Sequence, residues 1–290
     1  MHAACSRFRH IVLTALAVLS IPAATRADLI NYEPFSYAPA GADLLGANGG
    51  QGWSGPWAAG GFNASISNNF DLAAGSLAKD RLLTAGNRTT TLAQNAISGL
   101  VRSFDQPIGA GDTLTRYLSV LLRPEGTLHV GQFNGFFGLY LDGIGPNGDD
   151  VFIGKGGGGQ LDRWVVETRG GSGQFASSVA PVINETTLLV LKSQFTAGLE
   201  LFTLYVNPTP GEPEPTSGVL KNDLDLGGVS GIALYSTGAF SVDEIRWGQT
   251  FADVTPVPEP ATWMLAAIVS LLWFLLAPKR VSGAADVVAH

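Results

Sequence analysis

One segment near the end of this 290-residue chain can adopt very few structures. Residues 261–277 form an apolar run of 17 residues without a charged side chain. In a lipid bilayer a lone segment satisfies its backbone hydrogen bonds only as a helix. Seventeen residues is at the short end of what crosses a hydrocarbon layer of about 30 Å. Trp263 and Trp273 lie near its ends, where indole rings favour the membrane interface. The segment therefore predicts a single C-terminal transmembrane helix.

Charged residues on either side of this span predict its orientation. The basic pair Lys279 and Arg280 follows the span directly, whereas Asp253 and Glu259 precede it. Basic residues beside a spanning helix favour the cytoplasmic side of the membrane. Residues 281–290 are therefore predicted to form a cytoplasmic tail, with the body of the chain on the other side.

Three features follow one another here in a fixed order: the tetrapeptide Val257-Pro258-Glu259-Pro260, the apolar span, and the basic pair. Together, over residues 256–280, they resemble the PEP-CTERM sorting signal of Gram-negative bacteria. A second Pro-Glu-Pro, at residues 213–215, is followed by polar sequence, so the context carries the resemblance and not the tripeptide. The ten residues after Arg280 depart from that family, whose members usually end soon after the basic cluster.

The resemblance implies a fate for the chain. In that family a sorting protease, an exosortase, recognises the motif, which here consists of Val257, Pro258, Glu259 and Pro260. The precursor would be anchored in the inner membrane with its body in the periplasm. The body would then reach the cell surface or the extracellular matrix. An ordinary single-span C-terminal anchor is the alternative.

Residues 1–27 have the pattern of a secretory signal peptide. Arg7 and Arg9 precede an apolar stretch that is too short for a stable span, and cleavage is predicted after Ala27. Export would use the Sec translocon. Cys5, the only cysteine, lies inside this peptide, so the mature chain would rest on burial of its core without disulfides.

The body, residues 28–255, is predicted to be all-β. The chain has 37 glycines and only 14% charged residues, which favours a turn-rich β protein over a helical one. Short extended segments recur between turn residues, without a convincing helical period. The predicted strands are Ala64–Phe70, Leu100–Phe104, Thr113–Arg123, Asn134–Leu141, Val151–Ile153, Arg163–Thr168, Thr186–Phe195, Glu200–Asn207, Gly231–Tyr235 and Ala239–Trp247. Such a set predicts a two-sheet jelly-roll sandwich.

Apolar and polar residues alternate most clearly in residues 187–195 and 200–206. Leu191 and Leu204 each lie on an apolar face of their strand, so both are predicted core positions. Gly198, between the two segments, predicts a hairpin turn.

A second resemblance covers most of the body. Its start, Tyr32-Glu33-Pro34-Phe35-Ser36-Tyr37 followed by residues 49–57, is similar to laminin-G-like, concanavalin A-like domains of exported bacterial proteins. Its end, Val-Asp-Glu-Ile-Arg-Trp-Gly at residues 242–248, is similar to the last strand of the same family. The resemblance implies a jelly-roll sandwich whose members often bind glycans or serve in adhesion. It does not establish either activity here.

Glycoside hydrolysis, which some members of this fold perform, needs two carboxylates at a controlled separation. The laminarinase-like enzymes of the fold carry Glu-x-Asp-x-x-Glu on one strand, and no Glu-x-Asp occurs in this chain. Asp243 and Glu244 are adjacent on a predicted strand, so their side chains should point to opposite faces and accept structural hydrogen bonds. The body is therefore expected not to be an enzyme, with a hydrolase of unrecognised site design as the alternative.

One loop gathers oxygen ligands of the kind that calcium prefers, from Asp142, Asn147, Asp149 and Asp150. The same residue types make ordinary turns, so a plain turn is the main interpretation and a calcium site is the alternative. No other cofactor is expected, because the body has one histidine, His129, and no cysteine. The glycine run 154–159 formally matches a dinucleotide-binding pattern, but a strand should follow it, so it predicts a hairpin loop.

Three tryptophans, Trp53, Trp57 and Trp164, are expected to pack in the core or at its rim, as large aromatic residues in a sandwich usually do, and stacking on sugar rings is the alternative. The net charge of −7 argues against nucleic acid or anionic lipid as a partner of the body. The sequence thus predicts an exported, surface-directed, non-catalytic module that is glycan-binding or adhesive. Its expected partners are the translocon, the exosortase, the membrane and, as a ligand, an exopolysaccharide or other glycan.

Overall fold

The computed structural model describes residues 28–258, except residues 39, 61–67, 93–96, 112, 131, 146–148, 159–161 and 170–171. All of the strands belong to one compact unit, Arg26–Val257. The predicted signal peptide, Glu259 and Pro260 of the sorting motif, the predicted span 261–277 with Lys279 and Arg280, and the tail lie outside the described residues. In the part of the chain that is described, no helix is long and apolar enough to cross a membrane.

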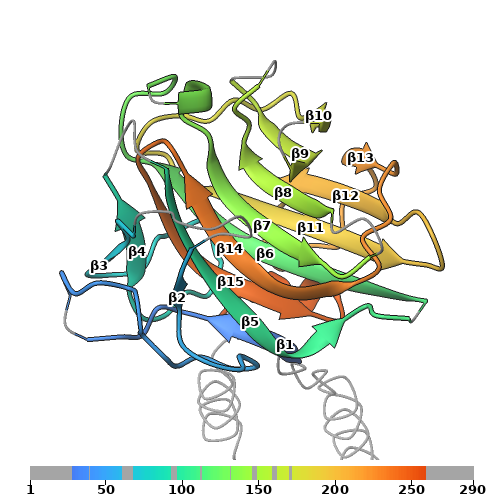
Figure 1. Cartoon of the computed structure of the whole chain (residues 1–290), viewed down its shortest axis with the longest axis horizontal. Coiled ribbons are helices and arrows are strands. Elements are labelled where there is room, and N and C mark those ends of the chain that lie inside the picture. The colour runs from blue at the N-terminus through green and yellow to red at the C-terminus, as the bar shows by residue number, and fades with distance from the viewer. Residues whose placement is uncertain are drawn as a thin grey trace, which may run out of the picture. The chain divides into compact units, whose positions relative to one another are not determined.

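The strands form two antiparallel sheets (Figure 1), as the all-β prediction requires. The eight-stranded sheet has the order β13 (Val219–Lys221), β12 (Leu201–Val206), β11 (Thr187–Phe195), β6 (Leu114–Pro124), β15 (Phe240–Gly248), β4 (Arg88–Thr91) and β3 (Asp71–Ala73), and β1 (Leu29–Glu33) also pairs with β15. The seven-stranded sheet has the order β10 (Ser172–Ala176), β9 (Trp164–Thr168), β8 (Asp150–Lys155), β7 (Phe137–Gly143), β14 (Val229–Ser236), β5 (Ser98–Ile108) and β2 (Ala58–Ala59).

A single large apolar core lies between the two sheets. Leu118 and Val120 on β6 contribute to it from one sheet, and Leu139 on β7 and Ile153 on β8 contribute from the other. All four side chains are fully buried. Burying a side chain of this size stabilises the folded state by about 1.5–3 kcal/mol. The prediction of a sandwich of two sheets held by core burial is confirmed.

Every predicted strand except Ala64–Phe70 overlaps an observed strand. Residues 64–67 are not among those described, and β3 begins only at Asp71. The strands that the prediction missed are β1, β2, β3, β4, β10 and β13, which have at most five residues each. Two of them, β4 (Arg-Thr-Thr-Thr) and β10 (Ser-Gly-Gln-Phe-Ala), have no clear apolar alternation, so sequence pattern could not reveal them.

Strand β11 is buried on both faces. Its inward face packs in the main core through Leu189 and Leu191. Its outward face, with Leu188 and Val190, belongs to a second apolar cluster that includes Phe251. Phe251 begins the short helix α2 (Phe251–Val254), which therefore covers part of the outer face of the eight-stranded sheet.

Leu191 and Leu204 confirm the predicted facing of their strands, since both are buried in the core and lie opposite each other in the register of β11 and β12. We expect Leu191→Ala and Leu204→Ala each to lower the free energy of unfolding by about 2–5 kcal/mol, because each leaves a cavity. Urea unfolding of the two variants measures this. Unchanged midpoints in both would contradict the packing described here.

Candidate functional site

A cluster of aromatic side chains lies on the outer face of the seven-stranded sheet. Strands β14, β7 and β8 run side by side there (Figure 1), and each contributes one ring to that face, from Tyr235, Tyr140 and Phe152 respectively. Tyr140 and Phe152 are opposite each other in the strand register, and their ring centroids are 4.7 Å apart. Phe136, just before β7, adds a fourth ring with its centroid 5.3 Å from that of Tyr235.

A strained turn places a fifth ring beside this cluster. Phe133, Asn134 and Gly135 have successive φ angles of 51°, 59° and 65°, all left-handed. This conformation costs a residue with a side chain roughly 1–2 kcal/mol. The Phe133 side chain is 65% exposed, and its ring centroid lies 6.3 Å from that of Phe136. The turn therefore holds a large apolar ring in solvent at the edge of the cluster. Backbone strain of this kind is concentrated at functional sites.

A buried lysine fixes the turn. Lys155, the last residue of β8, is fully buried, and its Nζ donates to the carbonyl of Asn134 at 2.7 Å and to that of Gly156 at 3.2 Å. Burial lowers the pKa of Lys155 to about 8. A Cβ atom at Gly157 would lie 2.5 Å from the Phe133 carbonyl oxygen, so only glycine permits this approach. Strand β9 follows the glycine run and pairs with β8, which confirms the predicted hairpin loop.

Polar side chains extend the same face beyond the rings. Glu167 on β9 lies opposite Phe152, and Gln174 on β10 donates a hydrogen bond to its carboxylate. Burial raises the pKa of Glu167. Burial, followed by the nearby Glu167 carboxylate, also raises the pKa of Tyr140. Arg169, after the end of β9, forms an ion pair with Asp150. Glu167, Tyr140 and Phe152 are themselves buried. The groups that this face presents to solvent are the exposed Phe133 and the half-buried Tyr235, Gln174 and Arg169.

The residues of the alternative calcium site are brought together only in part. Asp142 and Asp150 are cross-strand partners on β7 and β8, but Asp142 accepts a hydrogen bond from Ser230 and Asp150 pairs with Arg169. Asp149 lies beside this pair, with its carbonyl oxygen against Gly143, and Asn147 is outside the described residues. Within residues 28–258, as far as they are described, no three acidic, histidine or cysteine side chains gather as metal ligands.

The hypothesis that the three tryptophans stack on sugar rings requires a correction. Trp57 and Trp164 are 1% and 0% exposed, so neither ring has a face to offer a sugar, and both belong to the main core. Trp53 is half-buried, and the guanidinium carbon of Arg102 lies 4.8 Å from its ring centroid. Core packing, the main interpretation of these positions, is therefore correct for Trp57 and Trp164, and sugar stacking is wrong for both.

The prediction that Asp243 and Glu244 point to opposite faces is wrong. A β-bulge between Asp243 and Arg246 places Glu244 at a φ of 54°, and the extra residue interrupts the alternation. The neighbours Val242 and Ile245 both enter the main core, while both carboxylates lie on the outer side of the eight-stranded sheet.

Both carboxylates serve as the structural acceptors that the sequence predicts. Asp243 accepts from the amide of Leu77 at 2.7 Å and from the hydroxyl of Ser76, and Glu244 accepts from the amide of Ala85. Neither side chain is exposed, because the segment that carries these donors covers them. The pair is enclosed, and no substrate can reach it in this conformation.

Sequence reasoning did not single out Phe133, Phe136, Tyr140 or Tyr235. One signal was available, since the Asn-Gly dipeptide after Phe133 favours left-handed backbone. The grouping of the rings depends on strand order, with β14 inserted between β5 and β7, and pattern within one strand does not reveal it.

No protein-family model matches the chain, and no curated protein matches it. Solved structures resemble it at low identity. The endo-1,3-beta-glucanase from Streptomyces sioyaensis has a TM-score of 0.42 and 10% identity, over 79% of this chain and 98% of that chain. The carbohydrate recognition domain of Emp46p in its metal-free form has a TM-score of 0.38 and 12% identity, over 62% and 88%. The calcium-bound exoplasmic/lumenal domain of VIP36 has a TM-score of 0.38 and 12% identity, over 63% and 84%. These similarities carry no argument about what this chain binds.

Proposed function

We propose that this chain is an exported, surface-directed protein with a concanavalin A-like jelly-roll body that binds a glycan and does not act as an enzyme. The observation that carries the proposal is the exposed Phe133 ring, which a strained left-handed turn holds beside Phe136, and Phe136 in turn packs against Tyr235. Apolar faces of sugar rings pack against aromatic side chains, and neighbouring polar groups fix orientation through the sugar hydroxyls. Gln174, Arg169 and Asp142 are half-buried polar groups on the same face.

The non-catalytic part of the proposal is supported by the state of the carboxylates. Asp243 and Glu244 are enclosed, and Asp150 is bound to Arg169. Glycoside hydrolysis needs one free carboxylate and one carboxylic acid facing the same bond. Glu167, whose pKa burial raises, is the residue on the outer face that could supply an acid, so a hydrolase remains the alternative to be tested.

Substitution of Phe133 tests the binding site. We expect Phe133→Ala to weaken glycan binding about tenfold or more, which corresponds to about 1.4 kcal/mol. Leu199→Ala removes a side chain that is 61% exposed in the turn between β11 and β12, and it should leave binding unchanged. A glycan array identifies the ligand, and titration calorimetry on the purified protein compares the three affinities. Equal binding by Phe133→Ala would contradict the site. Release of reducing sugar that depends on Glu167 would support the hydrolase.

A second part of the proposal concerns delivery. We propose that a signal peptide of residues 1–27 directs export through the Sec translocon, and that an exosortase-type protease then recognises Val257-Pro258-Glu259-Pro260. Support comes from the ordered motif, apolar run and basic pair in the sequence. Pro260 biases Glu259 towards extended backbone, which a protease can bind next to a membrane.

Processing tests this part. We expect Glu259→Ala combined with Pro260→Ala to leave nearly full-length protein in the membrane, whereas the parent loses its C-terminal segment. The matched control changes the Glu-Pro pair at Glu212 and Pro213 to alanine and should be processed normally. An epitope placed after His290 reports the outcome by immunoblot. If it stays on the mature parent protein in cells with an active exosortase, a plain membrane anchor replaces the sorting signal.

A further inference from the structure

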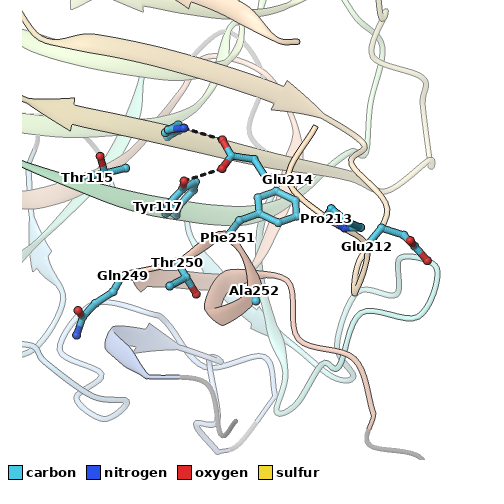
Figure 2. A pocket seen from close by; sticks show the side chains of 10 residues that line it. Thr115, Tyr117, Glu212, Pro213, Glu214, Gln249, Thr250, Phe251 and Ala252 are labelled. Atoms are coloured by element: carbon cyan, nitrogen blue, oxygen red, sulfur yellow. Dashed lines mark hydrogen bonds and ion pairs between the residues drawn. The ribbon is translucent and has the colours of Figure 1, made fainter. Parts of the chain in front are cut away.

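The internal Pro-Glu-Pro is held by its glutamate on the outer face of the eight-stranded sheet. Glu214 accepts a hydrogen bond from the Tyr117 hydroxyl at 2.7 Å, as Figure 2 shows. It accepts a second from Lys192 Nζ at 2.9 Å. The Tyr205 hydroxyl donates a third, at 2.6 Å. The donors come from β6, β11 and β12, and all three converge on one carboxylate.

The sheet itself positions these donors. Lys192 and Tyr117 are cross-strand partners in the register of β11 and β6, and the Lys192 ammonium lies 5.7 Å from the Tyr117 ring centroid. Burial alone would raise the pKa of Glu214, but the hydrogen bonds from Lys192 and the two tyrosines outweigh it, so this pKa lies below its ordinary value. One ammonium and two hydroxyls therefore form a site that matches a single ionised carboxylate.

An open depression of about 420 Å³ adjoins this site. The proline-rich loop between β12 and β13 (residues 207–218) and the connector after β15 (residues 249–257) both line it. Figure 2 shows Pro213 and Glu214 of the loop on one side and Thr250 and Ala252 of the connector on the other. Tyr117 and Lys192 also line it, so two of the three donor residues border the depression as well as the loop. A second peptide can therefore approach the donors without unfolding the sheet.

The same tripeptide recurs where the connector ends. The connector is fixed on this sheet by the Ser119 hydroxyl, which donates to the Val254 carbonyl at 2.8 Å, and Val257 packs beside Gly211 of the proline-rich loop. Pro-Glu-Pro follows Val257 directly, at residues 258–260. The chain thus carries two copies of one tripeptide. The prolines restrict the backbone of both copies, so each loses little conformational entropy on binding.

We infer that Tyr117, Lys192 and Tyr205 form a receptor for a glutamate flanked by prolines. In the structure Glu214 of the same chain occupies this receptor, and Pro258-Glu259-Pro260 of a second copy of the chain can replace Glu214 there. The cis ligand acts at an effective concentration in the millimolar range, so it suppresses binding of the second copy until the loop releases. The receptor would link neighbouring chains wherever they are concentrated. This inference does not depend on the proposed glycan binding.

A labelled peptide with the sequence of residues 256–262 tests the receptor by fluorescence anisotropy. The protein is the full chain in detergent with Glu259→Ala, so that its own C-terminal copy does not compete. Adding Glu214→Ala should tighten peptide binding at least tenfold, because it vacates the receptor. Adding Lys192→Met as well should abolish the gain. A peptide with glutamine in place of its glutamate should not bind.

Glu212→Ala is the matched control. Glu212 lines the same depression, but the three donors bind the carboxylate of Glu214. It should leave the affinity at the level of the parent. Tyr205→Phe keeps the ring and removes only the hydroxyl, so it should reduce the gain in peptide affinity. This variant tests the receptor even if the Lys192 variant misfolds. The inference is overturned if Glu214→Ala fails to tighten binding, or if Lys192→Met and Tyr205→Phe leave the tightened affinity intact.

Discussion

The free energy of unfolding is expected to fall as the pH rises from about 4 to about 8, and Asp243 is the main cause. Burial, together with the neighbouring Glu244 carboxylate, raises the pKa of Asp243 from 3.8 to about 8. Between these values the folded protein keeps the proton and the unfolded chain releases it, so stability is lost with rising pH. At 1.36 kcal/mol per pKa unit, the loss is on the order of 5 kcal/mol.

Asp243→Asn should remove most of this dependence. An asparagine is neutral at every pH, and its oxygen can still accept from the Leu77 amide. The variant should therefore match the parent near pH 4 and exceed it by several kcal/mol at pH 8. Urea unfolding at both pH values measures the difference, with the exposed Asp105→Asn as control. Burial also raises the pKa of Glu33, Glu200 and Glu244, so a smaller slope should persist. Parallel pH profiles for the parent and Asp243→Asn would refute this assignment.

Much of the fold was predictable because its longer strands show alternation of apolar and polar residues in the sequence. Leu191 and Leu204 could be placed in the core from alternation alone, and Gly198 could be placed in the hairpin turn. These features depend on residues close together in the chain. The short edge strands depend on partners supplied by the other strands, and their polar residues carry little pattern of their own.

The site was less predictable, for two physical reasons. Alternation gave the wrong face for Glu244, because a bulge adds one residue and reverses every side chain beyond it. Tyr140, Phe152 and Tyr235 meet only through the order of the strands, which local pattern does not contain. Phe133 has a left-handed backbone conformation, which bulky residues rarely adopt, so its residue type alone would have predicted a different conformation.

The opening segment, which carries the resemblance to laminin-G-like domains, is held to the body by a buried ion pair as well as by apolar packing. Glu33 at the end of β1 is fully buried and forms an ion pair with Arg102 of β5, so the pair links the two sheets. The Glu33 carboxylate also accepts from Tyr37 at 2.6 Å and from the Trp57 indole at 3.1 Å. The five donors of the Arg102 guanidinium are all engaged, by Glu33, Tyr37, Asn48, Gly49 and Gly55.

Arg102→Met should therefore lower the free energy of unfolding by about 3–5 kcal/mol, because it leaves the Glu33 carboxylate buried without its cation. Adding Glu33→Gln removes that charge, and the double variant should recover a large part of the loss, as neutral replacements of buried ion pairs commonly do. Arg116→Met, at a half-buried arginine that donates to the adjacent Thr115 carbonyl, is the control and should cost less than about 0.5 kcal/mol. Chemical unfolding of the parent, the Arg102→Met and Glu33→Gln single variants and the double variant completes the cycle, with Arg116→Met measured beside them. If the double variant is as unstable as the sum of the two single changes, Arg102 acts by tying the loop at Asn48–Gly55 to the sheet, and the buried charge is not the source of the loss.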